Sequence, residues 1–384
     1  MLQLKGLDIA PSQICGSIRI VPLIRRNIRR DLRLQRRNYN EKLGIVSLED
    51  KAYYLSYIPH GLVVSWTNDG NAVVNMGANI AKRDGKSFKG GCSARVMHRM
   101  VKHETKNTLR FLPLHLAMEG FLSLYFNGPR IAWEEYSKYT LSYGLGCRSE
   151  YSFCGRAITG LEEALHVFEI HPRQVGILIY VADALASAFV VSTPEDYRAL
   201  HYNLLEDFYG ELIYQYASLY DTTYEMNLSV DASKIKNLAD LRSAIVKMRS
   251  SWASFHQEVM STGLIGRKIE SKTVYTIDCF ELQRFITNIN SYTELNQENH
   301  IGEAIFRDNG ELEYLHTYRL SDAQIRRVYY LSKLDEHNWN LKETAKALSY
   351  TQEEFVFKME KEGFGYLFTQ QLRHKAIKKS RYGK

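Results

Sequence analysis

The stretch QVGILIYVADALASAFVVST, residues 174–193, constrains the fold more than any other part of the sequence. It is almost wholly apolar apart from an interruption at Ala182 and Asp183, and this pattern predicts two strands that fold back on each other there. A strand at a sheet edge, or with one face in water, would carry more polar residues. We therefore expect this strand pair near the centre of the main sheet.

A long helix is predicted directly after the second strand. Thr193 can cap its N-terminus, Pro194 suits its first position, and two acids follow in the first turn. The apolar residues of the next turns fall on one stripe, which consists of Tyr197, Leu200, Leu204, Phe208 and Leu212. This stripe predicts that the helix packs against the sheet.

Further elements follow the same two periodicities. Residues 16–24 alternate like a strand, and residues 61–77 form a hairpin pattern with its turn at 68–70. Residues 237–260 predict a second helix, followed by a β-rich piece with a turn in 307–315. Together these patterns predict an α+β fold, with a mixed or antiparallel sheet, long packing helices and a C-terminal all-α helix-turn-helix unit.

The chain of 384 residues exceeds what one hydrophobic core usually serves. We expect an α+β main domain over 1–225, a second α+β region over 226–318, a helix-turn-helix unit over 319–372 and a basic tail over 373–384. No signal peptide or membrane-spanning pattern is present, and the five cysteines lack CxxC spacing. These features predict a cytoplasmic protein without a metal, a cofactor or a membrane partner.

Positive charge is concentrated at the two ends of the sequence. Residues 1–45 hold ten basic and three acidic side chains, and residues 373–384 hold six basic and no acidic ones, while the whole chain carries only +7. This asymmetry predicts a polyanionic partner at the ends rather than over the whole surface. The tail shows no apolar periodicity, so we expect it to be mobile when nothing is bound.

The N-terminal charge comes mainly from seven arginines in thirteen positions, accompanied by one acid, Asp31. As a helix, the segment would hold arginines four residues apart with too few acids to pair them, which is unfavourable unless an anion is bound. As a strand, Leu32 and Leu34 would alternate with polar residues. The anion can be nucleic acid, or an acidic patch on this chain or on a second subunit; simple solvation of the arginines is the third possibility.

The C-terminal region carries the clearest local motif. Asn340 can cap a short helix, and Thr351 with Glu354 forms a capping box that opens the next helix, which Gly363 ends. The pattern over about the last sixty residues resembles the Fis-type helix-turn-helix, in which a small residue, here Ala345, lets the two helices cross closely. The resemblance implies that the second helix binds DNA.

The charge of that second helix favours a different partner. Residues 351–362 carry four glutamates and two lysines, and this net negative charge would repel phosphates. The alternative is that the same helices form a packing unit for protein contact. A DNA-binding function then depends largely on the basic tail that follows.

An enzymatic function is a competing hypothesis. Four residues could form an anion-binding acid–base cluster that acts on a nucleotide or an ADP-ribose product, namely His115, Glu119, Arg148 and Glu150. The common nucleophile, phosphate-loop and dinucleotide motifs are absent from the sequence. Catalytic residues therefore stay unassigned.

The region from Leu112 to Tyr216 is dense in aromatic, small and charged residues, as in LPLHLAMEGFLSLYFNGPRIAWEEYSKYT and HPRQVGILIYVADALASAFVV. In this character, over about residues 1–220, the chain is similar to the bacterial ARPP domains, which are named for their association with ADP-ribosylglycohydrolase and rhodanese-phosphatase genes in predicted conflict systems. The resemblance implies a prokaryotic defence or stress setting. It supplies no catalytic residue.

The sequence as a whole predicts a nucleic-acid-associated component of a bacterial anti-phage conflict system that binds through its basic ends. An oligomeric scaffold or sensor, in which the C-terminal helices contact protein, is the alternative beside the enzyme. We expect a homo-oligomer with nucleic acid and other proteins of the system as partners. The candidate nucleic-acid-binding residues are Arg25, Arg26, Arg29, Arg30, Arg33, Arg36, Arg37, Gln352, Lys358, Arg373, Lys375, Lys378, Lys379 and Arg381.

Overall fold

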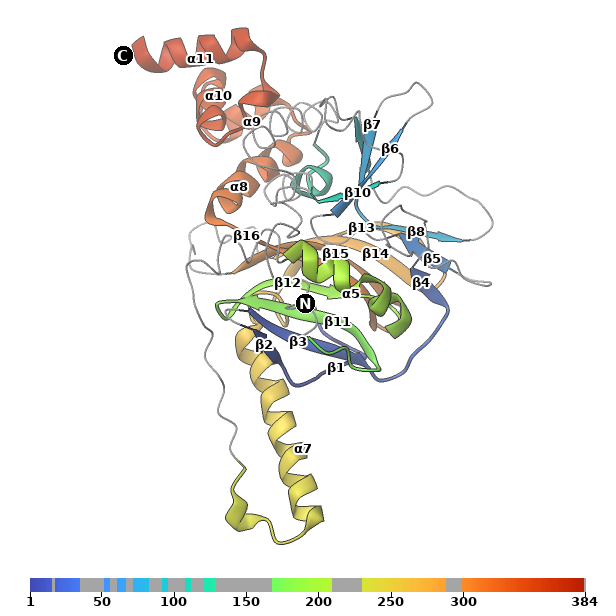
Figure 1. The fold of residues 1–384 in the computed structure, drawn as a ribbon. Coiled ribbons are helices and arrows are strands. Elements are labelled where there is room, and N and C mark those ends of the chain that lie inside the picture. Colours follow the sequence, from blue (N-terminus) through green and yellow to red (C-terminus); the bar gives the residue numbers. More distant parts are fainter. Residues whose placement is uncertain are drawn as a thin grey trace.

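The computed structural model has the predicted α+β fold, with a large antiparallel sheet and a C-terminal cluster of helices (Figure 1). The structure describes residues 1–15, 18–34, 52–55, 61–66, 72–82, 92–95, 108–111, 121–128, 168–208, 230–287 and 298–382. Within these ranges, no helix is both long and apolar enough to cross a bilayer.

The main sheet has nine strands in the order β1-β3-β11-β12-β16-β15-β14-β13, with β2 paired to β3. Its strands are β1 (Leu7–Ile9), β2 (Gln13–Cys15), β3 (Ile18–Arg25), β11 (Gln174–Val181), β12 (Ala184–Val190), β13 (Ile269–Ile277), β14 (Phe280–Thr287), β15 (Asn299–Arg307) and β16 (Leu312–Leu320). All of its pairings are antiparallel. The predicted hairpin is β11–β12, and β11 is central, between β3 and β12.

Two smaller sheets lie beside the main one. The first contains β6 (Gly61–Trp66), β7 (Ala72–Met76), β9 (Cys92–Arg95) and β10 (Thr108–Phe111), and the second contains β4 (Leu32–Leu34), β5 (Ala52–Leu55) and β8 (Asn79–Lys82). The antiparallel pair β6–β7 confirms the predicted hairpin, whose turn residues 68–70 lie outside the described ranges. Strand β4 confirms the strand interpretation of Leu32 and Leu34, and no helix forms between Arg25 and Leu34.

Apolar residues cover both faces of the central strands, which explains the continuous apolar run in the sequence. On one face, Tyr197, Leu200 and Leu204 of helix α5 (Pro194–Phe208) pack against the sheet, as predicted from their spacing. Thr193 caps this helix, because its hydroxyl accepts a hydrogen bond from the backbone N–H of Asp196 at 3.3 Å. The opposite face is covered in part by Leu264 and Ile265, which follow the second long helix.

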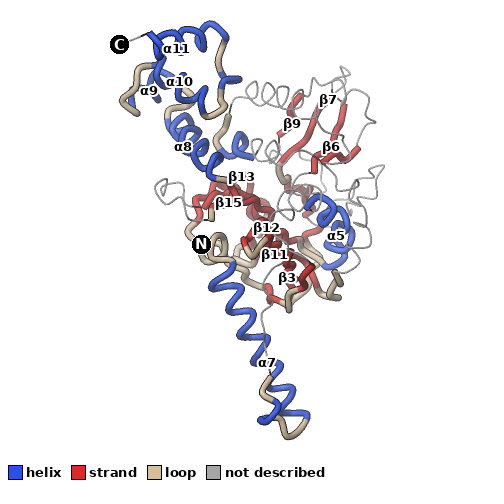
Figure 2. The backbone as a smooth tube through the Cα atoms, turned by 60° about the vertical axis from the view of Figure 1, so that its left-hand side comes forward, coloured by secondary structure: helices blue, strands red, loops and turns tan. Residues whose placement is uncertain are grey.

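That second helix is α7 (Leu238–Phe255), which begins at its N-cap Asn237 and runs on into a π-helix, His256–Met260. A short 3-10 turn, η3 (Ala232–Lys234), precedes it. Two views show α7 projecting from the body as an arm, at the end of the molecule away from the C-terminal helices (Figures 1 and 2).

The C-terminal cluster consists of α8 (Asp322–Glu336), α9 (Leu341–Ala347), α10 (Gln352–Lys361), the 3-10 turn η5 (Gly365–Leu367) and α11 (Gln370–Tyr382). Asn340 caps α9, and Thr351 with Glu354 forms the predicted capping box of α10. Gly363 has a φ of +84°, which suits its predicted place just after the helix. Ala345 is fully buried where α9 and α10 meet the core of the cluster.

Strands from two of the expected regions share the main sheet, and the expected tail is a helix. The limit expected near residue 225 lies outside the described ranges, and strands from both sides of it share one sheet through the β12–β16 pairing. The prediction of a mobile tail is wrong, because residues 370–382 form α11 and Ala376 is buried in the core of the cluster. The sequence shows too short an apolar pattern to reveal this helix, since few of its residues, among them Leu372 and Ala376, reach the core of the cluster.

Candidate functional site

The arginine-rich segment meets acids of its own chain. Each of the five described arginines forms an ion pair, and these pairs are Arg25–Glu313, Arg26–Asp8, Arg29–Glu311, Arg30–Glu195 and Arg33–Asp196. Glu195 and Asp196 are the two acids in the first turn of α5, so that turn both starts the helix and holds the segment. Arg36 and Arg37 lie outside the described ranges. These contacts favour the intramolecular explanation of the charge.

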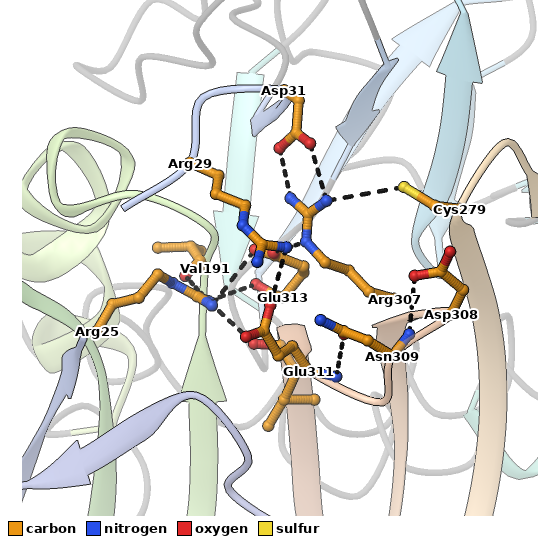
Figure 3. A network of polar contacts seen from close by, with 11 residues as sticks. Arg25, Arg29, Asp31, Val191, Cys279, Arg307, Asp308, Asn309, Glu311 and Glu313 are labelled. Carbon is orange, nitrogen blue, oxygen red and sulfur yellow. Dashed lines mark hydrogen bonds and ion pairs between the residues drawn. The ribbon is translucent and has the colours of Figure 1, made fainter. Parts of the chain in front are cut away.

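A buried network connects this segment to the far hairpin β15–β16 (Figure 3). The guanidinium of Arg307 binds both carboxylate oxygens of Asp31, one at 2.8 Å, and its Nε donates to Glu313. Arg25 donates to the carbonyl of Leu312 at 3.0 Å and pairs with the other oxygen of Glu313 at 3.4 Å. The side chains of Arg25, Arg307 and Glu313 are each at most 4% exposed.

The network is electrically balanced. With the Arg29–Glu311 pair included, three guanidiniums face three carboxylates. Burial alone would raise the pKa of Asp31, but the hydrogen bonds and charge of Arg307 outweigh it and hold this pKa below its usual value. A network in which each charge has a partner is expected of a structural contact rather than of an anion-binding site.

The basic tail is also neutralised in part by its own chain. Arg373 donates to Glu360 of α10 at 2.7 Å, while Lys375 and Lys379 reach Glu353 at 2.9 and 3.3 Å. Helix α11 therefore lies on an acidic face of α10 that the sequence interpretation assigned to another macromolecule. This arrangement explains why the second helix of the motif is acidic.

The remaining candidate nucleic-acid-binding residues differ in exposure and in their neighbours. Gln352 is half-buried at the first position of α10, and the ammonium group of Lys358 lies 4.6 Å from the centroid of the Tyr350 ring. Lys378 and Arg381 are exposed on α11. The structure therefore does not gather the twelve described candidate residues into one surface, since those in the N-terminal segment lie beside the main sheet and the others lie on the C-terminal helices.

A concave site lies elsewhere in the described part of the chain, where α7 joins the main sheet. A cavity of about 1030 Å³ opens there, lined by β3, by the β11–β12 turn, by residues 255–267 and by Glu298. Its charged side chains are Arg19, Asp183, Glu258, Arg267 and Glu298. Arg19 is 2% exposed, and its Nε donates to Asp183 at 2.9 Å.

Backbone geometry holds this site in place. Ala182 and Asp183 have φ of +48° and +59°, which lets β11 turn directly into β12 and brings Asp183 opposite Arg19. A positive φ is unfavourable for alanine, and strain of this kind tends to occur at functional positions. The π-helix His256–Met260 forms another wall, and π-turns within helices are also frequent at functional sites.

The carboxyl group of Glu298 is incompletely hydrogen-bonded within the described part of the chain. Its Oε2 is buried and has no hydrogen-bond partner within the described part of the chain, while Oε1 lies 3.7 Å from Arg319. Burial raises the pKa of this carboxyl above its usual value, although the charges of Arg319 and Arg267 and the backbone N–H of Leu185 oppose the shift. Gly263 lies so close that a Cβ there would come within 2.6 Å of Oε2. The fold therefore places the carboxyl against backbone.

Arg267 is the second incompletely paired group. It donates to the backbone carbonyl of Glu298 at 2.5 Å, and no described carboxylate forms an ion pair with it. A guanidinium that offers several N–H groups without a carboxylate partner is suited to bind a phosphate or a carboxylate of a ligand.

Aromatic and imidazole rings form the layer behind Arg19. The ring of Trp252 lies 5.6 Å from the guanidinium carbon of Arg19 and 4.3 Å from the ring of His256, which in turn lies 5.6 Å from the ring of Tyr180. His256 is fully buried, and neither ring nitrogen has a hydrogen-bond partner among the described residues. Burial lowers the pKa of His256 to about 4, so the ring is neutral at pH 7.

Sequence interpretation did not find this site. The sequence carries one signal of this site, which is Arg19, a charged residue within an otherwise apolar strand. Its partner Asp183 lies in the turn of a different, predicted hairpin. The proposed acid–base residues His115, Glu119, Arg148 and Glu150 lie outside the described ranges. Within those ranges, no three or more metal-binding side chains gather closely enough to hold an ion.

The part of the chain that holds most of the cavity resembles a known protein family. The ARPP-2 family model matches residues 2–278, while no curated protein and no solved structure matches the chain. The match includes all the cavity residues except Glu298, and it ends before α8. The Fis-type resemblance of the C-terminal helices therefore stays a prediction, whereas the predicted similarity of the N-terminal region to ARPP domains is confirmed. The chain belongs to the ARPP-2 family.

Proposed function

We propose that the protein is an enzyme that binds an anionic small molecule in the cavity at the base of α7 and transfers a proton through Glu298. The observation that carries this proposal is the placement of Glu298, a partly exposed carboxyl with a raised pKa and one buried oxygen that has no described hydrogen-bond partner, beside the Arg267 guanidinium in one cavity. Incompletely paired titratable groups in a cavity are typical of catalytic sites.

The surrounding groups support a nucleotide or an ADP-ribose product as the class of ligand. Arg267 can bind a phosphate, the partly exposed carboxylate of Asp183 can accept hydrogen bonds from sugar hydroxyls, and Phe255 offers a ring to a base. A carboxyl whose pKa is raised keeps its proton at higher pH than an ordinary glutamate does. Glu298 would therefore donate this proton to a leaving group.

Ligand binding and turnover can be separated experimentally. Isothermal calorimetry with AMP, ADP, ADP-ribose and inorganic phosphate should find a ligand that Arg267→Gln binds about 10- to 100-fold more weakly, since a hydrogen bond to a charged group contributes about 1.5–3 kcal/mol. Glu298→Gln should retain that binding and lose turnover of the same ligand. Lys268→Gln is the matched control, because Lys268 is exposed and does not line the cavity.

Two results would contradict the enzyme proposal. One is the absence of binding across the four compounds. The other is an equal loss of binding in Lys268→Gln and Arg267→Gln, which would mean that the overall charge of the surface matters rather than this cavity.

Nucleic-acid association in a conflict system is the second candidate function. It is favoured by Lys378 and Arg381, which are exposed on α11, whereas Arg373, Lys375 and Lys379 already pair with α10. With fewer available cations than the sequence suggested, the affinity and its salt dependence should both be modest. Homo-oligomeric assembly also stays a proposal.

The nucleic-acid hypothesis has its own test. Fluorescence anisotropy with single-stranded and duplex oligonucleotides at about 50 mM salt should detect binding that the double variant Lys378→Glu/Arg381→Glu loses. The double variant Lys342→Glu/Lys346→Glu changes two exposed lysines of α9 and serves as the charge-matched control. Equal weakening by both pairs, or no binding by the unmodified protein, would contradict a role for α11.

A further inference from the structure

Helix α7 has no buried residue in its outer part. Its eighteen residues make it about 27 Å long at 1.5 Å per residue, and Trp252, near its inner end, is its only buried residue. Both views show the helix projecting from the body (Figures 1 and 2). A lone helix of this length is only marginally stable in water, because most helical stability comes from packing of an apolar face.

The arm nevertheless has an apolar face with regular spacing. Leu238, Leu241, Ile245 and Met248 follow one another at intervals of three, four and three residues, and the series continues to Trp252 and Phe255. This is the spacing by which one helix packs along another, with these residues at the a and d positions. Leu238 is 63% exposed and Leu241 is 37% exposed, so the outer half of this seam is open to solvent.

One edge of the seam carries positive charge. Arg242 and Arg249 each follow an a-position residue by four, which places both at e positions beside the seam. Both are exposed, and neither forms an ion pair with a described residue. The other edge carries Ala244 and Ser251 at the g positions.

This charge distribution argues against a second copy of α7 as the occupant. In an antiparallel pair, e positions face e positions, so Arg242 of one copy would approach Arg249 of the other. In a parallel pair, e positions face g positions, which hold alanine and serine rather than an acid. Neither arrangement gives the two guanidiniums a carboxylate.

We propose that the arm is a docking surface for an amphipathic helix of another protein, one that has an apolar seam and acidic residues along the edge that meets Arg242 and Arg249. This interaction is separate from ligand binding in the cavity, because the outer seam residues Leu238 and Leu241 and the two arginines do not line the cavity. Apolar burial along the seam supplies affinity, and the acidic edge sets orientation and partner choice.

Two synthetic helical peptides test the proposal with the full-length protein. Both have three heptads with leucine at a and d; one carries glutamate and the other lysine at all e and g positions. Fluorescence anisotropy should show the glutamate peptide binding about tenfold more tightly, and the double variant Arg242→Glu/Arg249→Glu should reverse the preference. Leu241→Asp should abolish binding of both peptides without changing the melting temperature, because Leu241 is exposed.

Val246→Asp is the matched control, because Val246 is 66% exposed on the same helix but lies outside the seam. Three outcomes would overturn the proposal. Equal binding of both peptides would mean unspecific apolar adhesion. If light scattering shows that the molecular mass doubles as protein concentration rises, and Leu241→Asp prevents this dimerisation, the seam binds a second copy of the chain. Binding to phosphatidylserine vesicles in place of either peptide would assign it to a lipid surface.

Discussion

The buried network around Arg307, Asp31 and Glu313 and the cavity at the base of α7 both bring arginines and carboxylates together beside the main sheet. The two regions differ in how completely these charges are paired. In the network, Glu313 binds two guanidiniums and Asp31 binds Arg307 through both oxygens. In the cavity, one buried oxygen of Glu298 has no partner among the described residues, and the one described acceptor of Arg267 is a backbone carbonyl.

The two regions also differ in how many charges they hold. The seven arginines attract attention by number, but the five that the structure describes have acids of the same chain beside them. The cavity holds fewer charges, and its groups keep hydrogen-bonding capacity for a ligand. Incomplete pairing in a concave place is therefore the ground on which we propose a function for the cavity rather than for the arginine-rich segment.

The largest expected effect comes from removing the charge of Glu313. The substitution Glu313→Gln leaves the buried guanidiniums of Arg25 and Arg307 without this carboxylate, and breaking a buried ion pair in this way costs about 3–5 kcal/mol. Glu298→Gln should leave the free energy of unfolding unchanged or raise it slightly, because glutamine keeps the shape of a carboxyl whose charged form is disfavoured by burial. Urea denaturation of both variants measures the contrast, and similar costs in the two would show that the cavity is as structural as the network.

The two regions should also titrate in different pH ranges. His256 has a native pKa of about 4, whereas the unfolded chain binds this proton near pH 6.5. Stability is therefore lost as pH falls from about 6.5 towards 4, by roughly 2 kcal/mol at pH 5 for this residue, at about 1.4 kcal/mol per pKa unit. The pKa of Asp31 is lowered, so the contribution of the network is lost only below the ordinary aspartate range.

A comparison of His256→Gln with the unmodified protein isolates this contribution. Denaturation between pH 7 and 5 should show a smaller pH dependence in the variant, while buried His201 and His300, whose pKa values are also lowered, contribute equally to both proteins. An identical slope in the two proteins would mean that His256 has the same pKa in the folded and the unfolded state.

The smallest effect is expected at the surface ion pairs of α11. Glu353 meets Lys375 and Lys379, which are 70% and 48% exposed, and such pairs contribute about 0.2–1 kcal/mol each. Glu353→Gln should therefore lower the free energy of unfolding only slightly, and less at high salt. A loss as large as that of Glu313→Gln, or one that salt does not reduce, would mean that α11 is held as firmly as the buried network.

The elements that the sequence predicts correctly are those whose information is local. The strands β11 and β12 follow from one apolar run, and the caps at Thr193, Asn340 and Thr351 follow from side chains that bond backbone groups two or three residues away. The helix α11 was missed because a short basic segment has few apolar residues, and its partners Glu353 and Glu360 lie on a different helix.

The sequence by itself determined the α+β class, the central hairpin, the buried stripe of α5 and the capped C-terminal helices, because hydrophobic periodicity and capping act over a few residues. Only the tertiary structure decided which acids meet the arginines and that Arg19, Asp183, Arg267 and Glu298 line one cavity. These groups come together through antiparallel pairing of distant strands, and no local pattern specifies which strands pair. The number of charged residues can be read from the sequence, but their ion-pair partners are distant in the sequence and become neighbours only in the folded protein.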